Sequence, residues 1–370
     1  MDDVSILCQK TLISGKNRLI DILSQKNYMS KLTPYFSNTY NFLYGTAGVL
    51  YGLQQFDESI PQDLLDATLE KIKSKDNEVL PSSLSRGKLA PMIVIYRLTL
   101  DPNLENKISN LLNCEFSRIA FSKKISFSLD NGLSGIGILS LIMYEITQKE
   151  YYLSIPDIIV KIILQQKIIL STFGLAYGNT GVAVFLIKYY KYRKKISILK
   201  QSKKYILTDI QKGQLINGKN KLRGIRCNLK SNIPYIYIPY GTAGIIKTTL
   251  LYLGEIDDLG LRKELNFLVN SLKVSSTLQS GYAFGTAGII STLNDILKFD
   301  KTYPYQVRIY FEKLIRSLLS TGFKMKNQII FSGDQNFKEF IDYGSGSMGI
   351  LLTLKKIIDN QEFDPIFKDL

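Results

Sequence analysis

The sequence predicts an all-α protein, an α/α toroid (barrel) of about seven helix-pair repeats, each marked by a Gly-x-x-Gly turn. Three observations predict this fold class. A short glycine motif recurs along the chain, and an apolar run at helical spacing follows each copy. Strand-like alternation is scarce, and its main occurrence, at 233–239, is interpreted as an ordered loop.

The glycine motif is the strongest signal. Its six full copies carry the pairs Gly45 and Gly48, Gly132 and Gly135, Gly178 and Gly181, Gly241 and Gly244, Gly285 and Gly288, and Gly346 and Gly349. A degraded copy follows Arg86, at Gly87, with Ala90 in place of the second glycine. The seven first glycines are separated by 42, 45, 46, 63, 44 and 61 residues. Because a two-helix repeat takes about 40–47 residues, the two long intervals are interpreted as one repeat plus an insertion.

Each repeat is predicted to be a helix, a glycine turn and a second helix. The run Val182–Ile187 follows one motif, and 261–272 has apolar residues at helical spacing. We expect the first glycine to adopt a positive φ in a tight turn and the second to allow close backbone approach. An open solenoid is the alternative, but helices that are apolar on several faces favour closure into a toroid.

The composition excludes several kinds of chemistry. The chain has no histidine, which removes the usual metal ligand, the usual general base, and every Ser/His or Cys/His nucleophile pair. Cys8, Cys114 and Cys227 lie far apart without CxxC spacing, so we interpret them as reduced cysteines and not as a zinc site. The chemistry must use Tyr, Asp, Glu, Lys, Arg and backbone dipoles.

The sequence also bears on localisation. The start, Met1-Asp2-Asp3-Val4, lacks the basic and apolar runs of a secretory signal. The most apolar stretch, 132–144, is too short to span a bilayer. We therefore expect a cytoplasmic protein that does not bind a membrane.

Positive charge is concentrated between Lys188 and Lys230. This segment has fourteen Lys and Arg and one acid, Asp209, so it carries +13 of the chain's net charge of +15. It is predicted to be a basic insertion, with a partly mobile loop after Ile210. Such a patch attracts an acidic leader peptide or partner domain, with Lys194 and Lys195 as predicted contacts, although a solvated loop is the alternative. Nucleic-acid binding is disfavoured because no nucleic-acid-binding module accompanies the patch.

These repeats resemble the LanC-like superfamily, the α/α-barrel cyclases of lanthipeptide biosynthesis, from about Tyr35 to Ile358. The stretch Leu32-Thr33-Pro34-Tyr35-Phe36, which leads into Leu43-Tyr44-Gly45, is similar to the start of the cyclase domain of class III synthetases. The resemblance implies a helical lead-in at 1–34 and a cyclase domain at 35–370. Nothing in the chain resembles a kinase, so it would act alone, with a kinase/lyase partner, or as one domain of a longer chain.

The resemblance implies a reaction and its substrate. In this family the cyclase adds cysteine thiols to dehydroalanine or dehydrobutyrine of one precursor peptide, which closes lanthionine or labionin thioether rings. Zinc-dependent members carry Trp-Cys-Tyr-Gly and Cys-His-Gly motifs, where this chain has Ile238-Pro239-Tyr240-Gly241 and Ala283-Phe284-Gly285. Because Pro, Ala and Phe cannot bind zinc, and class III domains also lack the ligands, we expect a metal-free cyclase without cofactors.

The residues before the first glycines are expected to surround one end of the barrel. Tyr177 stands where the family's Gly-Leu-Ala-His-Gly motif has a histidine regarded as an acid/base, so it is the first candidate for the proton donor. Tyr240 is the second candidate, while Arg86 would stabilise the enolate and Asp130 would orient a hydroxyl. The predicted substrate-binding residues are Tyr44, Asn131, Phe284 and Ser345. For each tyrosine, simple packing with a structural hydrogen bond is the alternative.

The proposed chemistry is feasible without a metal. A free thiol has a pKa of about 8.5, so forming the thiolate near pH 7.5 costs only about 1.4 kcal/mol. Positioning the two reactants can contribute roughly 7–11 kcal/mol. Two alternatives stay open: a degenerate cyclase that only presents the peptide to a kinase or lyase, and an α/α-barrel glycosidase. The glycosidase would need paired carboxylates, for which only Asp130 and Asp342 are candidates.

Overall fold

The computed structural model describes residues 2–32, 39–73, 83–166, 168, 170–216, 223–300, 305–333 and 338–368. Within them the chain forms two compact units. Unit 1 contains residues 1–77 and 273–364, and unit 2 contains residues 78–272 and 365–370. The predicted boundary between 34 and 35, with the stretch Thr33–Phe36 on which it rests, lies outside the described residues.

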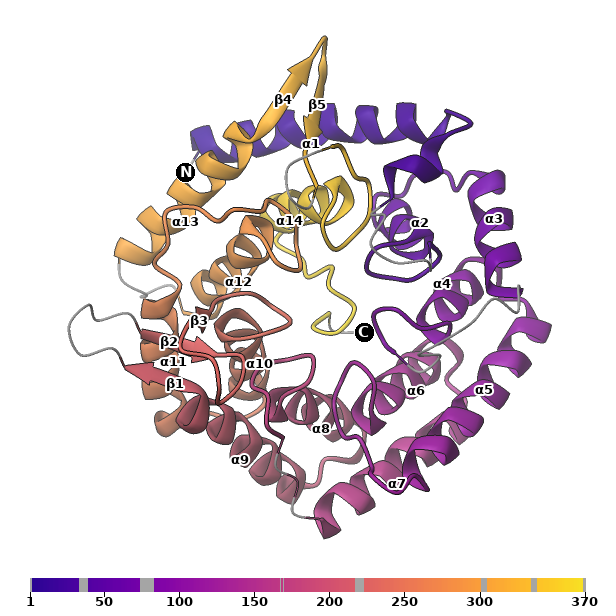
Figure 1. The fold of residues 1–370 in the computed structure, drawn as a ribbon, viewed down its shortest axis with the longest axis vertical. Coiled ribbons are helices and arrows are strands. Elements are labelled where there is room, and N and C mark those ends of the chain that lie inside the picture. Colours follow the sequence, from indigo (N-terminus) through magenta and orange to yellow (C-terminus); the bar gives the residue numbers. More distant parts are fainter. Residues whose placement is uncertain are drawn as a thin grey trace. The chain divides into compact units, whose positions relative to one another are not determined.

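Unit 2 consists of four helix pairs and a small sheet (Figure 1). In each pair the first helix, which we call the motif helix, begins next to a glycine motif, and the second packs against it. The pairs are α4 (Leu89–Thr99) with α5 (Pro102–Ala120), α6 (Leu133–Thr147) with α7 (Tyr151–Gln165), α8 (Asn179–Arg193) with α9 (Ile196–Gly213), and α10 (Thr242–Glu255) with α11 (Leu259–Ser271).

The motif helices form the core of unit 2. Neighbouring motif helices pack on one another in the order α4, α6, α8 and α10. In α8 every side chain from Asn179 to Tyr189 is buried. The apolar helices predicted to follow the glycine motifs are therefore covered on all sides over most of their length, as their composition requires.

Unit 1 contains three more helix pairs and a hairpin. They are α2 (Thr46–Gln55) with α3 (Gln62–Lys73), α12 (Thr286–Phe299) with α13 (Tyr305–Ser320), and α14 (Ser347–Asp359) with α1 (Asp2–Leu23). A short 3-10 helix, η1, covers Tyr28–Lys31. Helix α1, expected as a lead-in before the repeats, thus supplies the partner of the last motif helix. No helix among the described residues has the length and apolar character needed to cross a membrane.

The two long intervals between glycine motifs contain the strands. In unit 2, β1 (Gln214–Ile216), β2 (Arg223–Arg226) and β3 (Pro234–Tyr235) pair antiparallel, with Leu215 opposite Gly224 and Ile225 opposite Tyr235. In unit 1, β4 (Gly322–Met325) and β5 (Gln328–Phe331) form a hairpin. The predicted basic insertion therefore begins inside a helix pair. The expectation of a loop after Ile210 is wrong for residues 211–216, because α9 continues to Gly213 and leads into β1, whereas residues 227–233 belong to no helix or named strand.

The motif glycines are required by packing. Gly45, Gly132 and Gly285 have φ values of −127°, −133° and −142°, which any residue adopts, so the predicted positive φ is wrong for them. Among the first glycines of the six full motifs, only Gly241 has a positive φ, of +86°. A Cβ atom at Gly45 would lie 2.4 Å from the carbonyl oxygen of Thr39, and one at Gly48 would lie 2.1 Å from that of Phe42. Close backbone approach, expected for the second glycine, explains both positions.

Candidate functional site

Three of the glycine loops are held by a side chain four residues before the first glycine. In unit 1, Asn41 Oδ1 accepts from the Tyr44 amide at 2.7 Å, and Asp342 Oδ1 accepts from the Ser345 amide at 2.7 Å. In unit 2, Ser83 Oγ accepts from the Arg86 amide at 3.1 Å. These local turns orient the residue just before the glycine. These turns were not predicted, although an Asn, Asp or Ser three residues before a turn amide is a recognisable signal.

Backbone hydrogen bonds join neighbouring loops within unit 2. The Leu84 amide donates to Asp130 O at 2.6 Å, the Asp130 amide to Ala176 O at 2.9 Å, and the Ala176 amide to Pro239 O at 2.9 Å. Successive repeats thus bring equivalent residues side by side. In unit 1 the Ala283 amide donates to Gly344 O at 2.8 Å, and the Gly344 amide donates to Leu43 O at 2.6 Å. The expectation that residues before the glycines gather at one end holds within each unit.

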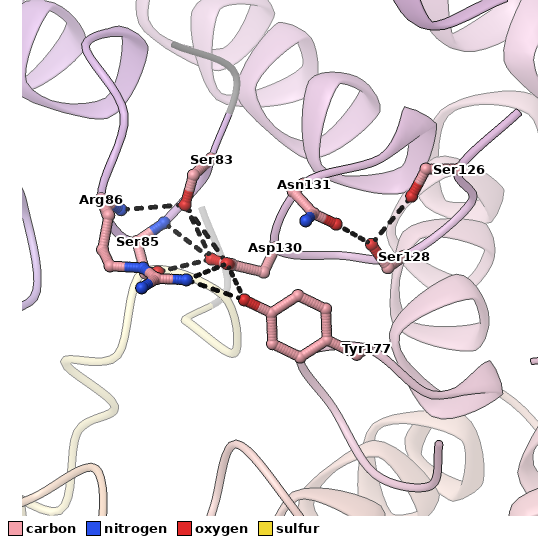
Figure 2. Close-up of polar contacts among 8 residues, drawn as sticks. All are labelled: Ser83, Ser85, Arg86, Ser126, Ser128, Asp130, Asn131 and Tyr177. Carbon is pink, nitrogen blue, oxygen red and sulfur yellow. Dashed lines mark hydrogen bonds and ion pairs between the residues drawn. The ribbon is translucent and has the colours of Figure 1, made fainter. Parts of the chain in front are cut away.

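Asp130 is the centre of a polar cluster in unit 2 (Figure 2). The Tyr177 hydroxyl donates to its Oδ2 at 2.6 Å. Ser85 donates to Oδ1 from its hydroxyl at 2.5 Å and from its amide at 3.1 Å, and the Ser83 hydroxyl lies 3.2 Å from both oxygens. Asp130 is 5% exposed, so these donors replace the water that its charge would otherwise need.

Arg86 completes the cluster from the side of the degraded motif. Its Nη2 donates to the Tyr177 hydroxyl at 3.0 Å and lies 3.8 Å from Asp130 Oδ2. The Arg86 side chain is 32% exposed, whereas Asp130 is enclosed. The Tyr240 ring stacks on the Tyr177 ring with centroids 5.7 Å apart. Unit 2 therefore brings together all four predicted catalytic residues, with the cation as the most open charged group.

The environment keeps both tyrosines protonated. Burial, and then the charge of Asp130, raises the pKa of Tyr177 well above 10, although the Arg86 charge opposes the shift. Burial and the Asp130 charge likewise raise the pKa of Tyr240. At neutral pH each phenol can donate a proton, and neither is available as a base.

The loop that carries Tyr177 is fixed by Asp209, which lies on α9 and is fully buried. Its carboxylate accepts from the Gly174 amide at 3.1 Å, the Thr180 amide at 2.8 Å and hydroxyl at 2.7 Å, and the Asn179 side chain at 2.8 Å. Burial raises the pKa of Asp209, while these hydrogen bonds lower it. In the sequence Asp209 stands out only as the single acid of a basic segment, because no local pattern shows that it accepts hydrogen bonds from a loop 30 residues earlier.

The predicted substrate-binding residues of unit 2 lie at different distances from this cluster. Asn131 follows Asp130 in the same loop, and its side chain accepts from the Ser128 hydroxyl at 2.7 Å (Figure 2). Lys194 and Lys195 lie beyond the far end of α8, roughly 22 Å along the helix from Tyr177 at 1.5 Å per residue. Lys194 stands 3.5 Å from Glu255 and over the Tyr190 ring. The two lysines could contact a substrate only away from the cluster.

The predicted substrate-binding residues of unit 1 are mostly enclosed. Tyr44 is 7% exposed and Ser345 is 4% exposed, while Phe284 is half-buried. The Ser345 hydroxyl donates to Asp342 at 3.0 Å. Direct substrate contact stays a prediction for all three, and burial disfavours it for Tyr44 and Ser345.

The carboxylates do not favour the glycosidase alternative. Asp130 is engaged by two serines and Tyr177, and Asp342 is fully buried and accepts from the amides of Ser345 and Gly346. Asp130 therefore joins the two neighbouring loops, and Asp342 holds its own loop in place. In the part of the chain that the structure describes, no group of three or more His, Cys, Asp and Glu side chains is arranged to hold a metal ion.

Comparisons with known proteins agree with this architecture. The profile of the family "Lanthionine synthetase C-like protein" matches residues 16–218 and 123–369. Nisin cyclase is similar in structure, with a TM-score of 0.68 and 17% identity over 95% of this chain and 96% of that chain. An unsaturated glucuronyl hydrolase from Streptococcus agalactiae has a TM-score of 0.50 and 12% identity over 99% of this chain and 92% of that chain. The search of curated proteins finds no match. The likeness to nisin cyclase confirms the predicted fold class, an all-α toroid of helix-pair repeats.

Proposed function

The chain belongs to the lanthionine synthetase C-like family, and from that premise we propose that it is a lanthipeptide cyclase that works without zinc. Its substrate would be a dehydrated precursor peptide, and its products thioether rings. Two findings support the proposal: the family match, and the likeness in fold to a protein named nisin cyclase. The cluster of Arg86, Asp130 and Tyr177 carries it, because these groups suit an addition that forms an enolate.

The residues present do not fit a zinc ion. The positions matched to the zinc motifs hold Pro239, Tyr240, Ala283 and Phe284. Zinc in proteins takes Cys, His or carboxylate ligands, and three of these four residues have no ligating atom in their side chains. The proposed reaction therefore uses only the chain's own groups. The same departures are found in class III synthetases, so a kinase/lyase protein or domain is the partner that we propose.

The reaction would proceed in two steps. The cysteine thiol of the peptide loses its proton to solvent, and the thiolate sulfur bonds to the β-carbon of the dehydroamino acid. The electron pair of the carbon–carbon double bond then forms an enolate, whose oxygen the exposed edge of Arg86 can pair with. A proton added at the α-carbon restores the balance, so that no net proton is gained or lost.

Tyr177 would supply that proton. Its hydroxyl has the raised pKa of a weak acid, yet it is far more acidic than the α-carbon that receives the proton. The tyrosinate left behind is stabilised by the adjacent Arg86, whose Nη2 is 3.0 Å away, and it regains a proton from solvent. Asp130 and the stacked Tyr240 ring hold the phenol in one orientation.

A second candidate function rests on the direction of that hydroxyl. Tyr177 donates to Asp130 in the structure, so its proton points toward the carboxylate. A scaffold that only binds the peptide and presents it to a kinase or lyase would keep this bond permanently. In the catalytic reading the hydroxyl turns toward the substrate, while Arg86 compensates the charge of Asp130.

Activity can be tested with a dehydrated lanthipeptide precursor. The peptide is incubated with and without the protein, free thiols are alkylated, and the masses are measured. A cyclase removes alkylatable thiols faster than the uncatalysed reaction does. Binding of the peptide with no change in alkylation would instead support the scaffold.

A further inference from the structure

The segment after α14 is held in unit 1 by side chains of three motif helices or their loops. Residues 360–364 form neither helix nor strand. The Tyr51 hydroxyl of α2 donates to the Phe363 carbonyl at 2.7 Å, and the hydroxyl of Tyr282, before α12, donates to the Asp364 carboxylate. The first hydrogen bond is to the backbone and the second is to an acidic side chain. Peptide-binding proteins combine the same two kinds of contact, to the main chain and to side chains.

A buried lysine provides the third contact. Lys356 on α14 is 2% exposed, and its Nζ is 2.8 Å from Ser291 Oγ, 2.7 Å from Asp295 Oδ1 and 2.5 Å from Glu362 Oε2. Burying an ammonium group is costly unless it is paired. Because Ser291 and Asp295 belong to α12, Lys356 keeps a carboxylate and a hydroxyl as partners if Glu362 leaves. The helices therefore do not depend on the segment to neutralise this lysine.

The segment also has a shape of its own. Glu362 Oε1 accepts from the amides of Phe363 and Asp364, both at 2.9 Å, so this glutamate closes a local turn while its other oxygen binds Lys356. Lys355 Nζ lies 5.4 Å from the centroid of the Phe363 ring. A carboxylate, an aromatic ring and a second carboxylate are thus each matched by a separate group on the helices.

We propose that Lys356, Tyr282 and Tyr51 form a binding site for a peptide with the pattern Glu-aromatic-Asp, and that residues 362–364 occupy it as an internal ligand. The site takes its ligand through one buried cation and two phenol donors. Burial raises the pKa of Tyr282 well above 10, so it remains a donor at neutral pH. The proposal concerns unit 1 alone and does not depend on the proposed cyclase reaction.

The test converts the internal ligand into an exchangeable one after folding. Recognition sequences for a site-specific protease are inserted between Asn360 and Gln361 and between Asp364 and Pro365 of the full chain, so that the segment exchanged after cleavage of the folded protein contains only residues of unit 1. A fluorescent synthetic peptide with the sequence of residues 361–364 is then added, and binding is followed by fluorescence anisotropy. The expected result is saturable exchange of the labelled peptide for the cleaved segment.

Two comparisons identify the contacts. A peptide with glutamine at 362 and asparagine at 364 should bind about tenfold more weakly or worse, because its charge-assisted hydrogen bonds are lost. Lys356→Met in the cleaved protein should have a similar effect, whereas Lys313→Met, which changes an exposed lysine of α13, should have none.

Three outcomes would overturn the proposal. The cleaved protein could keep its segment without exchange over a day, or it could unfold on cleavage, and either result would make residues 362–364 a fixed part of the core. Equal binding of the acidic and the neutral peptide would show that the lysine and the phenols do not select the ligand. Circular dichroism before and after cleavage separates the first two results.

Discussion

The glycine loops of the two units share one backbone frame but use it differently. Three residues before the first glycine, the loops of unit 1 carry buried or half-buried aromatic residues and those of unit 2 aliphatic ones, namely Phe42, Tyr282 and Tyr343 against Leu84, Leu129, Leu175 and Ile238. One residue before the glycine, unit 1 buries Tyr44 and Ser345 and leaves Phe284 half-buried, whereas unit 2 leaves all four residues half-buried, namely Arg86, Asn131, Tyr177 and Tyr240. Loops with the same backbone frame therefore bury more of their side chains in unit 1, and we propose that the more open loops of unit 2 carry the chemistry.

The largest difference between the units is expected at Arg86. Arg86→Met keeps much of the side-chain volume but removes the cation beside Tyr177, so the rate of ring closure should fall by roughly 10²–10³. Arg262→Met is the matched control, because Arg262 of α11 pairs with the exposed Asp257 and should leave the rate unchanged. Alkylation kinetics measure both variants. Equal rates for Arg86→Met and the native chain would remove Arg86 from the mechanism.

Replacing one buried carboxylate in each unit distinguishes an effect on stability from an effect on the reaction rate. Asp209→Ala in unit 2 and Asp342→Ala in unit 1 each leave several buried amide or hydroxyl donors without an acceptor. Each should lower the free energy of unfolding by roughly 3 kcal/mol. Only Asp209→Ala should also slow ring closure, because its loop carries Tyr177. Chemical denaturation and alkylation kinetics give the two quantities. A rate loss of the same size in both variants would show that instability alone affects turnover.

The pH dependence should reflect the substrate thiol. With a thiol pKa of about 8.5, the rate should rise roughly tenfold from pH 7.5 to 9.5 and then level off. Because the pKa of Tyr177 is raised, the proton donor is not lost in this range. The same raised pKa favours the protonated phenol in the folded state, so stability should fall as pH rises above about 10. A rate that declines between pH 7.5 and 9 would contradict the assignment.

The smallest effect is expected on the basic surface of unit 2. Lys195, Lys200 and Lys204 are exposed around the start of α9, and changing all three to Glu should weaken binding of an acidic leader or partner. The loss should be larger at low salt than at high salt, because exposed charges are screened beyond about 10 Å at 0.1 M. Fluorescence titrations at two salt concentrations measure it. Unchanged affinity at both would support the solvated-surface interpretation.

Much of the local architecture could be predicted from the repeat. The spacing of the glycines located every motif helix, and the equivalence of Arg86, Tyr177 and Tyr240 placed them near one another, because equivalent positions in stacked repeats meet. The long-range choices could not be predicted. Nothing near Asp209 in the sequence shows that it accepts hydrogen bonds from the groups around Thr180. Nothing in the sequence of α1 shows that this helix packs on α14, near the other end of the chain.

The backbone conformation of the glycines was harder to predict than their presence. A glycine in a turn suggests a positive φ, but at Gly45 the neighbouring carbonyl of Thr39 leaves no room for a Cβ atom at an ordinary φ. The degraded motif lacks the second glycine, yet Ser83, Ser85 and Arg86 of its loop all contact Asp130.

The central claim, that Tyr177 donates the proton, is tested most directly by Tyr177→Phe. This change keeps the ring that stacks on Tyr240 and removes the hydroxyl between Arg86 and Asp130. Ring closure should slow by roughly 10²–10⁴, while peptide affinity and melting temperature should change little. A native rate accompanied by a loss of about 1 kcal/mol in stability would contradict this claim and make the hydroxyl a structural hydrogen bond.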